Sequence, residues 1–100
     1  MKKFKVVILP QAQDDFRDAV KYYRDIEGKL GERFIKITKS TVNELKKLPM
    51  YQIKYEQMRL RIIHKFPYSI HYIVNEEHKT IYIYGIRFAP SNPETWPRTI

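Results

Sequence analysis

The chain has 100 residues, which suits one domain over residues 1–100 and is too short for two independent cores. It contains no cysteine, so disulfide bonds, thiolate metal sites and cysteine nucleophiles are excluded. Lys and Arg total 19 against 11 Asp and Glu, and this net charge of +8 favours an acidic or polyanionic partner. The charge does not distinguish a nucleic acid from an acidic protein.

The first residues place lysines before a short apolar run, Val6–Leu9. This run is shorter than the apolar core of a signal peptide and far shorter than the roughly 20 residues of a membrane span. We therefore expect a buried strand over Phe4–Leu9 and a cytoplasmic protein without membrane contact.

Two amphipathic helices are predicted after this strand. Apolar residues recur every three or four positions over residues 11–27 and again over residues 30–48. Residues 27–31 contain two glycines and separate the two patterns, and Pro49 ends the second. The pattern therefore predicts a helical hairpin.

The rest of the chain alternates with a period of two residues. This alternation predicts strands over Arg59–Phe66, Tyr68–Val74 and Thr80–Phe88, with a polar turn over residues 75–79. Tyr51–Gln57 fits either a loop or an additional short strand. The element order β-α-α-β-β-β predicts an α+β domain in which the helical hairpin packs on one face of a mainly antiparallel sheet.

The strand over Arg59–Phe66 carries the clearest candidate site. We expect its even positions to lie under the helices, namely Leu60, Ile62, His64 and Phe66. The odd positions would then form a basic row on the open face of the sheet, consisting of Arg59, Arg61 and Lys65. Guanidinium groups in such a row can clamp phosphates, although a row of ordinary solvated residues would show the same pattern.

The three histidines do not share metal-ligand spacing, and we expect no metal ion and no cofactor. His64 is predicted to lie in the core, and His78 lies in the polar turn. His71 falls on the open face beside Ser69 and is the acid–base candidate.

The last strand is predicted to be the most buried one. Its side chains divide into Ile81 and Ile83 on one face and Tyr82, Tyr84 and Ile86 on the other. The proline-rich segment after it contains Trp96, which we expect to pack over the open end of the sheet. The pair Tyr22-Tyr23 in the first helix is interpreted as a packing element.

Several motifs together resemble the RelE/ParE superfamily of bacterial toxins. They are Tyr22-Tyr23, Leu30-Gly-Glu-Arg-Phe34, Arg59-Leu-Arg61, Lys65-Phe-Pro-Tyr68 followed by Ile70-His-Tyr72, and Asn92-Pro-Glu-Thr-Trp96. The similarity covers nearly the whole chain and is greatest to the ParE-like, plasmid-stabilisation branch.

The resemblance implies a growth-inhibiting toxin of a type II toxin–antitoxin system. Such a toxin is neutralised by a cognate antitoxin whose disordered, acidic C-terminal segment wraps across it, often in a heterotetramer. Some branches cleave mRNA on the ribosome, whereas ParE-type members poison DNA gyrase. The net charge of +8 is consistent with either target and with an acidic antitoxin segment that folds on binding.

The family's functional positions are only partly matched. Arg59 and Arg61 match second-strand positions that contact substrate phosphate in nuclease members, and Lys65 matches a frequent basic residue before the turn. Relatives commonly have a His after the last strand and an Arg before the Asn-Pro pair. Here Phe88 and Ser91 occupy these places, which argues against RelE-like RNA cleavage.

We therefore expect a ParE-like toxin that acts by binding. Its basic surface for the target or the antitoxin would consist of Arg59, Arg61, Lys65 and Arg87. Two alternatives stay open. One is a ribosome-dependent mRNA endoribonuclease with Arg59 and Arg61 on phosphate and His71 or Tyr72 in proton transfer. The other is a degenerate, non-toxic module that still binds antitoxin.

Overall fold

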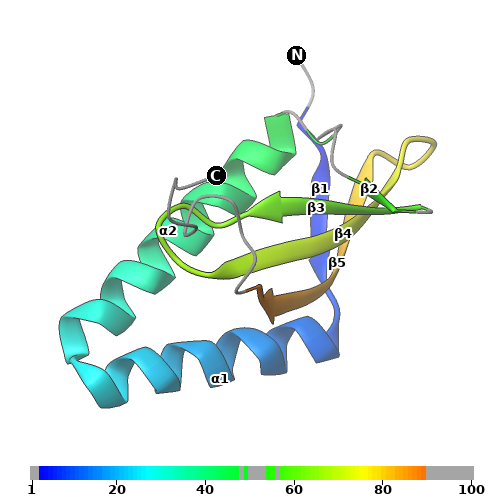
Figure 1. Ribbon diagram of the computed structural model, residues 1–100. Helices are drawn as coiled ribbons and strands as arrows, with labels where there is room; N and C mark the ends of the chain where they lie inside the picture. Colours follow the sequence, from blue (N-terminus) through cyan, green and yellow to red (C-terminus); the bar gives the residue numbers. More distant parts are fainter. Residues whose placement is uncertain (1–2, 48, 50–53, 56, 90–100) are drawn as a thin grey trace, which may run out of the picture.

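The protein folds as a helical hairpin packed on a five-stranded sheet (Figure 1). The structure is a computed structural model, and it describes residues 3–47, 49, 54–55 and 57–89. The elements are β1 (Lys5–Ile8), α1 (Pro10–Ile26), α2 (Gly28–Lys47), β2 (Lys54–Tyr55), β3 (Met58–Ile62), β4 (Tyr68–Asn75) and β5 (Thr80–Phe88). The strand order is β1-β5-β4-β3-β2; β1 runs parallel to β5 and all other neighbours are antiparallel. The predicted α+β fold is confirmed, and β2 is the additional short strand.

The two helices are joined by a single extended residue. α1 begins at Pro10, one residue earlier than predicted. Proline fits the first position of a helix because the backbone N–H that it lacks would have no hydrogen-bond partner within the helix there. The chain leaves the helix at Glu27, whose φ is −164° and whose N–H donates to the Tyr23 carbonyl at 2.9 Å. α2 starts directly after it at Gly28, ahead of the predicted Leu30. The hairpin is therefore tighter than the sequence pattern indicates.

The core between the hairpin and the sheet is largely aromatic. Phe34 of α2 is fully buried, and its ring lies 5.3 Å from Tyr23 and 5.1 Å from Phe66, measured between centroids. Burial raises the pKa of Tyr23 to about 12, so this phenol is neutral at all physiological pH values. Tyr22 is 57% exposed but packs edge-on against Tyr23. The Tyr22-Tyr23 pair is thus a packing element, as predicted.

A β-bulge in β5 changes which side chains face the helices. The consecutive residues His71 and Tyr72 of β4 are opposite Gly85 and Ile83, so one residue of β5 is left without a partner. The extra residue inverts the alternation. Ile86 therefore lies 4% exposed on the same side as Ile83. The prediction that Ile86 shares a face with Tyr82 was wrong for this reason.

Three predictions concern residues outside the described part of the chain: the end of the second helix at residue 48, the position of Ser91 and the packing of Trp96. Among the described residues, no helix is both long enough and apolar enough to span a bilayer.

Candidate functional site

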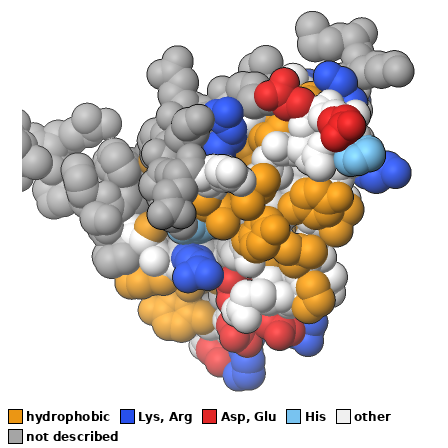
Figure 2. Space-filling view, turned by 90° about the vertical axis from the view of Figure 1, so that its right-hand side faces the viewer, with side chains coloured by type: hydrophobic (Ala, Val, Ile, Leu, Met, Phe, Trp, Pro, Cys, Tyr) orange, Lys and Arg blue, Asp and Glu red, His pale blue; other side chains and the backbone are white. Residues whose placement is uncertain are grey.

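One face of the sheet is turned away from the helices, and we call it the open face. The register places half-buried apolar side chains there, including Val7 of β1, Leu60 and Ile62 of β3, Ile73 of β4 and Tyr82 of β5. Figure 2 shows hydrophobic side chains gathered over the sheet side of the molecule, above a group of acidic side chains. Within the described residues, this face therefore offers an apolar surface rather than the expected basic row.

Arg59 and Arg61 do not lie on the open face. Residues opposite each other on neighbouring strands share a face, and Arg59 is opposite Tyr72 while Arg61 is opposite Ile70. Tyr72 and Ile70 are both fully buried on the helix side. Arg61 also forms an ion pair with Glu44 of α2. The predicted basic row on the open face was wrong, because the alternation of β3 has the opposite phase.

Lys65 and His64 lie in the turn after β3, since the strand ends at Ile62 rather than at Phe66. Both side chains are exposed, and Lys65 adopts a left-handed conformation with φ of 68°. The prediction of a core histidine at His64 was therefore wrong. Phe66 is buried at 5% exposure, as predicted, because the turn folds it back towards the aromatic core.

Ser69, His71 and Arg87 form a group of polar side chains on the open face, called the open-face cluster below. Ser69 and Arg87 are opposite each other on β4 and β5, and His71 follows two residues after Ser69 on the same face. The Ser69 hydroxyl Oγ lies 3.1 Å from Nε2 of His71. The structure thus brings together two of the predicted site residues, His71 and Arg87, and separates them from Arg59, Arg61 and Lys65.

The protonation of His71 follows from its surroundings. Burial lowers the pKa of His71 below its ordinary value, the Arg87 cation lowers it further, and the Asp15 carboxylate opposes the shift. At neutral pH the imidazole is therefore uncharged and can accept a proton or a hydrogen bond. Next to it, Arg87 is exposed and can pair with an anion.

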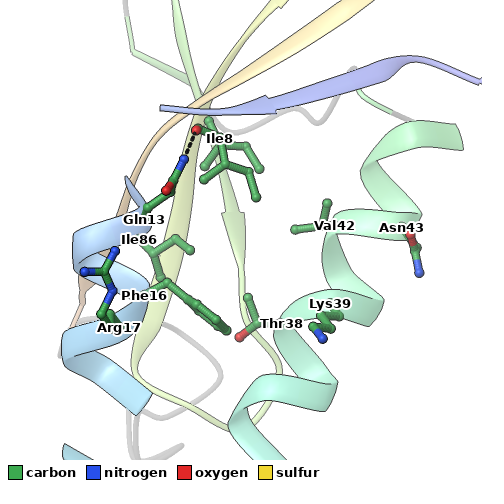
Figure 3. A pocket seen from close by; sticks show the side chains of 10 residues that line it. Ile8, Gln13, Phe16, Arg17, Thr38, Lys39, Val42, Asn43 and Ile86 are labelled. Carbon is green, nitrogen blue, oxygen red and sulfur yellow. Dashed lines mark hydrogen bonds between the residues drawn. The ribbon is translucent and has the colours of Figure 1, made fainter. Parts of the chain in front are cut away.

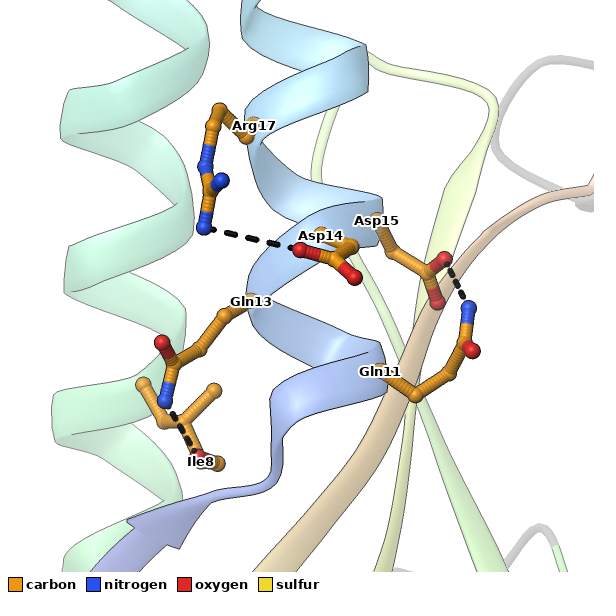
Figure 4. Close-up of polar contacts among 6 residues, drawn as sticks. All are labelled: Ile8, Gln11, Gln13, Asp14, Asp15 and Arg17. Atoms are coloured by element: carbon orange, nitrogen blue, oxygen red, sulfur yellow. Dashed lines mark hydrogen bonds and ion pairs between the residues drawn. The ribbon is translucent and has the colours of Figure 1, made fainter.

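Asp15 of α1 completes this region and could not be recognised from the sequence. Its Oδ2 accepts the backbone N–H of Ile86 at 3.1 Å, and its Oδ1 accepts the side-chain amide of Gln11 at 2.9 Å. Figure 4 shows Gln11 and Asp15 on the side of α1 next to β5, with Gln13 and Arg17 on the side towards α2. In the sequence, Asp15 looks like any other acid on a solvated helix face.

Gly85 leaves the space that this arrangement needs. A Cβ atom added at Gly85 would lie 2.9 Å from Nε of Arg87 and 3.2 Å from Oδ2 of Asp15. Any larger residue would therefore force the guanidinium away from the strand. Tyr72, the other proton-transfer candidate, is fully buried, and its hydroxyl donates to the Pro49 carbonyl at 2.9 Å. Among the described residues, no three acidic or histidine side chains are placed to hold a metal ion.

The fold and the sequence both match known toxins. A family model described as ParE toxin of type II toxin–antitoxin systems, parDE, matches residues 6–88. The chain belongs to the ParE toxin family. No curated protein matches its sequence. The crystal structure of the toxin–antitoxin complex RelBE2 from Mycobacterium tuberculosis has a similar fold, with a TM-score of 0.55 and 13% sequence identity over 86% of this chain and 98% of that chain. The predicted RelE/ParE superfamily membership is thus confirmed, and the chain is a toxin of a type II toxin–antitoxin system.

Proposed function

We propose that this ParE-family toxin arrests bacterial growth by binding a protein target through the open face. The observation that carries the proposal is the apolar character of that face, where Ile73 and Tyr82 are opposite each other on β4 and β5, Leu60 lies on the neighbouring strand β3, and all three are half-buried. Contiguous apolar surface of this kind is typical of protein-binding sites, whereas nucleic-acid surfaces carry rows of Lys and Arg. This favours DNA gyrase, the target of ParE-type members, over an mRNA.

We also propose that a cognate antitoxin with an acidic C-terminal segment neutralises the toxin, in an assembly that can be a heterotetramer. The net charge of +8 supports such a partner, and the structurally similar RelBE2 is itself a toxin–antitoxin complex. In this proposal Arg87 contributes to the target surface. Arg59, Arg61 and Lys65 lie away from the open face and contact the antitoxin.

A second candidate function rests on the open-face cluster. An uncharged imidazole at His71 beside the cation of Arg87 could accept the 2′-hydroxyl proton of an RNA while the guanidinium binds the phosphate. This is the ribosome-dependent endoribonuclease alternative, now with His71 and Arg87 as its residues. A toxin that has lost activity but still binds antitoxin is the third candidate, motivated by Phe88 and Ser91 in place of the usual His and Arg.

The first test is the growth of a bacterial host after induction of this gene alone. The second adds the purified toxin to purified gyrase and DNA and measures trapped DNA breaks. We expect arrest and gyrase-linked breaks with the wild type, and loss of both with Leu60→Lys or Ile73→Lys. Ile26→Lys, at a position 57% exposed at the end of α1, is the matched control and should behave as the wild type. Circular dichroism must show that each variant is folded.

Other outcomes identify the other candidates. Ribosome-dependent mRNA fragments that disappear with His71→Ala, without gyrase-linked breaks, would establish the endoribonuclease. Soluble, folded wild-type protein that arrests no growth would indicate the degenerate module. Rescue of the arrested host by the protein encoded in the adjoining gene is the test of the antitoxin, and its absence would contradict neutralisation.

A further inference from the structure

The second helix, α2, carries an excess of positive charge. It contains two acids, Glu32 and Glu44, and six cations: Lys29, Arg33, Lys36, Lys39, Lys46 and Lys47. The excess of four positive charges is half of the net charge of +8 of the whole chain. α1 differs, because its four aspartates outnumber its three cations.

The positive charge of α2 is not compensated by ion pairs. Glu32 pairs with Arg24 of α1 at 3.1 Å, and Glu44 pairs with Arg61 of β3, so both acids of α2 are held by arginines of other elements. Within the described part of the chain, none of the six α2 cations forms an ion pair. The three cations of α1 are by contrast all paired: Arg17, Lys21 and Arg24.

The solvent-facing side of α2 is a continuous polar stripe, which we call the basic ridge. The buried residues of α2 lie on the opposite side of the helix and include Phe34, Thr38 and Leu45. The ridge consists of six exposed residues: Lys29, Arg33, Lys36, Ser40, Asn43 and Lys47. Figure 3 shows Asn43 extending from α2 away from α1, whereas Val42 extends towards the space between the helices. From Lys29 to Lys47 the ridge is about 27 Å long, at about 1.5 Å per residue.

The side chains of the ridge match the chemistry of a nucleic-acid backbone. Lys and Arg bind phosphates by charge, and Ser and Asn donate hydrogen bonds to phosphate oxygens. No residue of the ridge is apolar, so an amphipathic peptide would find no anchor there. No residue of the ridge is aromatic either, so the unpaired bases of a single strand would have no ring to stack on. A duplex needs neither, because it presents its phosphates on the outside.

We propose that the basic ridge of α2 binds the phosphate backbone of duplex DNA without sequence preference. The match of charge carries this inference, since four unpaired cations line one exposed side of a helix. The open face lies on the other side of the sheet, so the toxin can contact a protein and a DNA duplex at the same time. The choice of DNA over duplex RNA rests on the proposed function, because gyrase acts on DNA.

The experiment titrates a fluorescently labelled DNA duplex of about 30 base pairs with the full-length toxin, at salt concentrations from about 50 to 200 mM. Fluorescence anisotropy measures the association constant. Its logarithm should fall against the logarithm of the salt concentration with a slope of about −3 to −4, because about 0.9 counterion is released for each phosphate bound. A second duplex of equal length and unrelated sequence should bind equally well.

Two double variants, each losing one Arg and one Lys, separate the ridge from the net charge. Arg33→Gln with Lys36→Gln should reduce the steepness of the slope by about 2 and weaken binding at about 100 mM salt at least about tenfold. Arg17→Gln with Lys21→Gln removes two exposed, ion-paired cations of α1 and should weaken binding less than about threefold. Glutamine retains high helix propensity, and circular dichroism must show that both variants are folded.

Several results would overturn the inference. One is a wild-type toxin that does not bind the duplex at about 50 mM salt. Equal losses in the two double variants would show that net charge, not the ridge, governs binding. Tighter binding of an RNA of the same length, single-stranded or duplex, would remove the assignment to DNA. DNA binding that survives in Arg33→Gln with Lys36→Gln, while this variant no longer binds the protein of the adjoining gene, would assign the ridge to the antitoxin.

The failure of this inference can be told apart from the failure of the proposed function, because the titration contains no gyrase. A toxin that binds DNA through the ridge but traps no gyrase-linked breaks overturns the proposed function alone. A toxin that traps such breaks but does not bind the duplex overturns the ridge alone.

Discussion

The carboxylate of Asp15 in α1 accepts the backbone N–H of Ile86 in β5 at 3.1 Å, across 71 positions of the chain. β1 pairs with β5 only as far as Ile83, so within the described part of the chain no strand flanks β5 on this side beyond that point. Asp15 therefore satisfies a backbone donor where the sheet ends and the helix begins to cover it.

Replacement of Asp15 by alanine should lower the free energy of unfolding by about 1–3 kcal/mol, because it leaves the Ile86 N–H without its partner. Asp14→Ala is the control. This variant also removes a carboxylate from the first turns of α1, but the only interaction lost is the solvated ion pair with Arg17. The free energy of unfolding should therefore fall by less than about 0.5 kcal/mol. Urea unfolding followed by circular dichroism measures both. Equal losses in the two variants would show that the contact with β5 contributes nothing.

The charges around His71 should shift its pKa in opposite directions. Arg87→Gln removes a cation that lowers the pKa of His71, so the pKa should rise towards its ordinary value. Asp15→Asn removes a carboxylate that raises it, so the pKa should fall. The rise with Arg87→Gln should be partial, because burial is the largest cause of the shift and remains. NMR titration of the imidazole measures the pKa of His71 in the wild type, in Arg87→Gln and in Asp15→Asn. If both variants shifted this pKa in the same direction, the placement of Arg87 and Asp15 around His71 would be wrong.

Stability should fall in mild acid because of His71. In the unfolded chain the imidazole takes up a proton at a pKa of about 6.5, whereas in the folded protein the pKa is lower. Between these two values the unfolded state binds more protons, so the free energy of unfolding decreases as the pH falls through this window. The loss is complete below the folded pKa.

Replacement of His71 by glutamine should remove this part of the pH dependence. The check is urea unfolding of wild type and His71→Gln at pH steps from about 7.5 to 5. The wild type should lose more stability than the variant over this interval. Parallel curves would mean that the pKa of His71 is the same in the folded and unfolded states.

The helices and the order of the elements could be predicted because their signals are local. The apolar stripe that contains Phe16 and Tyr23, and the one that contains Phe34 and Leu45, repeat at helical spacing, and all four residues pack in or against the core. Where one face of an element is clearly apolar and the other polar, the sequence indicates which face packs.

The phase of β3 could not be predicted because both faces of the sheet are apolar. Leu60 and Ile62 suggested a core face, yet they lie on the open face beside other apolar residues. Arg61 on the helix side is stabilised by Glu44, a contact between residues 17 positions apart. The bulge next to Gly85 and the contact of Asp15 with β5 likewise depend on pairing across the chain. Alternation within one strand carries no information on such contacts.

Tyr72 provides a test that separates a structural hydroxyl from a catalytic one. Its hydroxyl donates to the Pro49 carbonyl at 2.9 Å in a fully buried position, so Tyr72→Phe should lower the free energy of unfolding by about 1–2 kcal/mol. Tyr22→Phe, at a ring 57% exposed, removes the same atom from a solvated site and should change it little. At equal levels of folded protein, Tyr72→Phe should arrest growth as strongly as the wild type. A folded Tyr72→Phe protein without toxicity would instead indicate that this hydroxyl takes part in proton transfer.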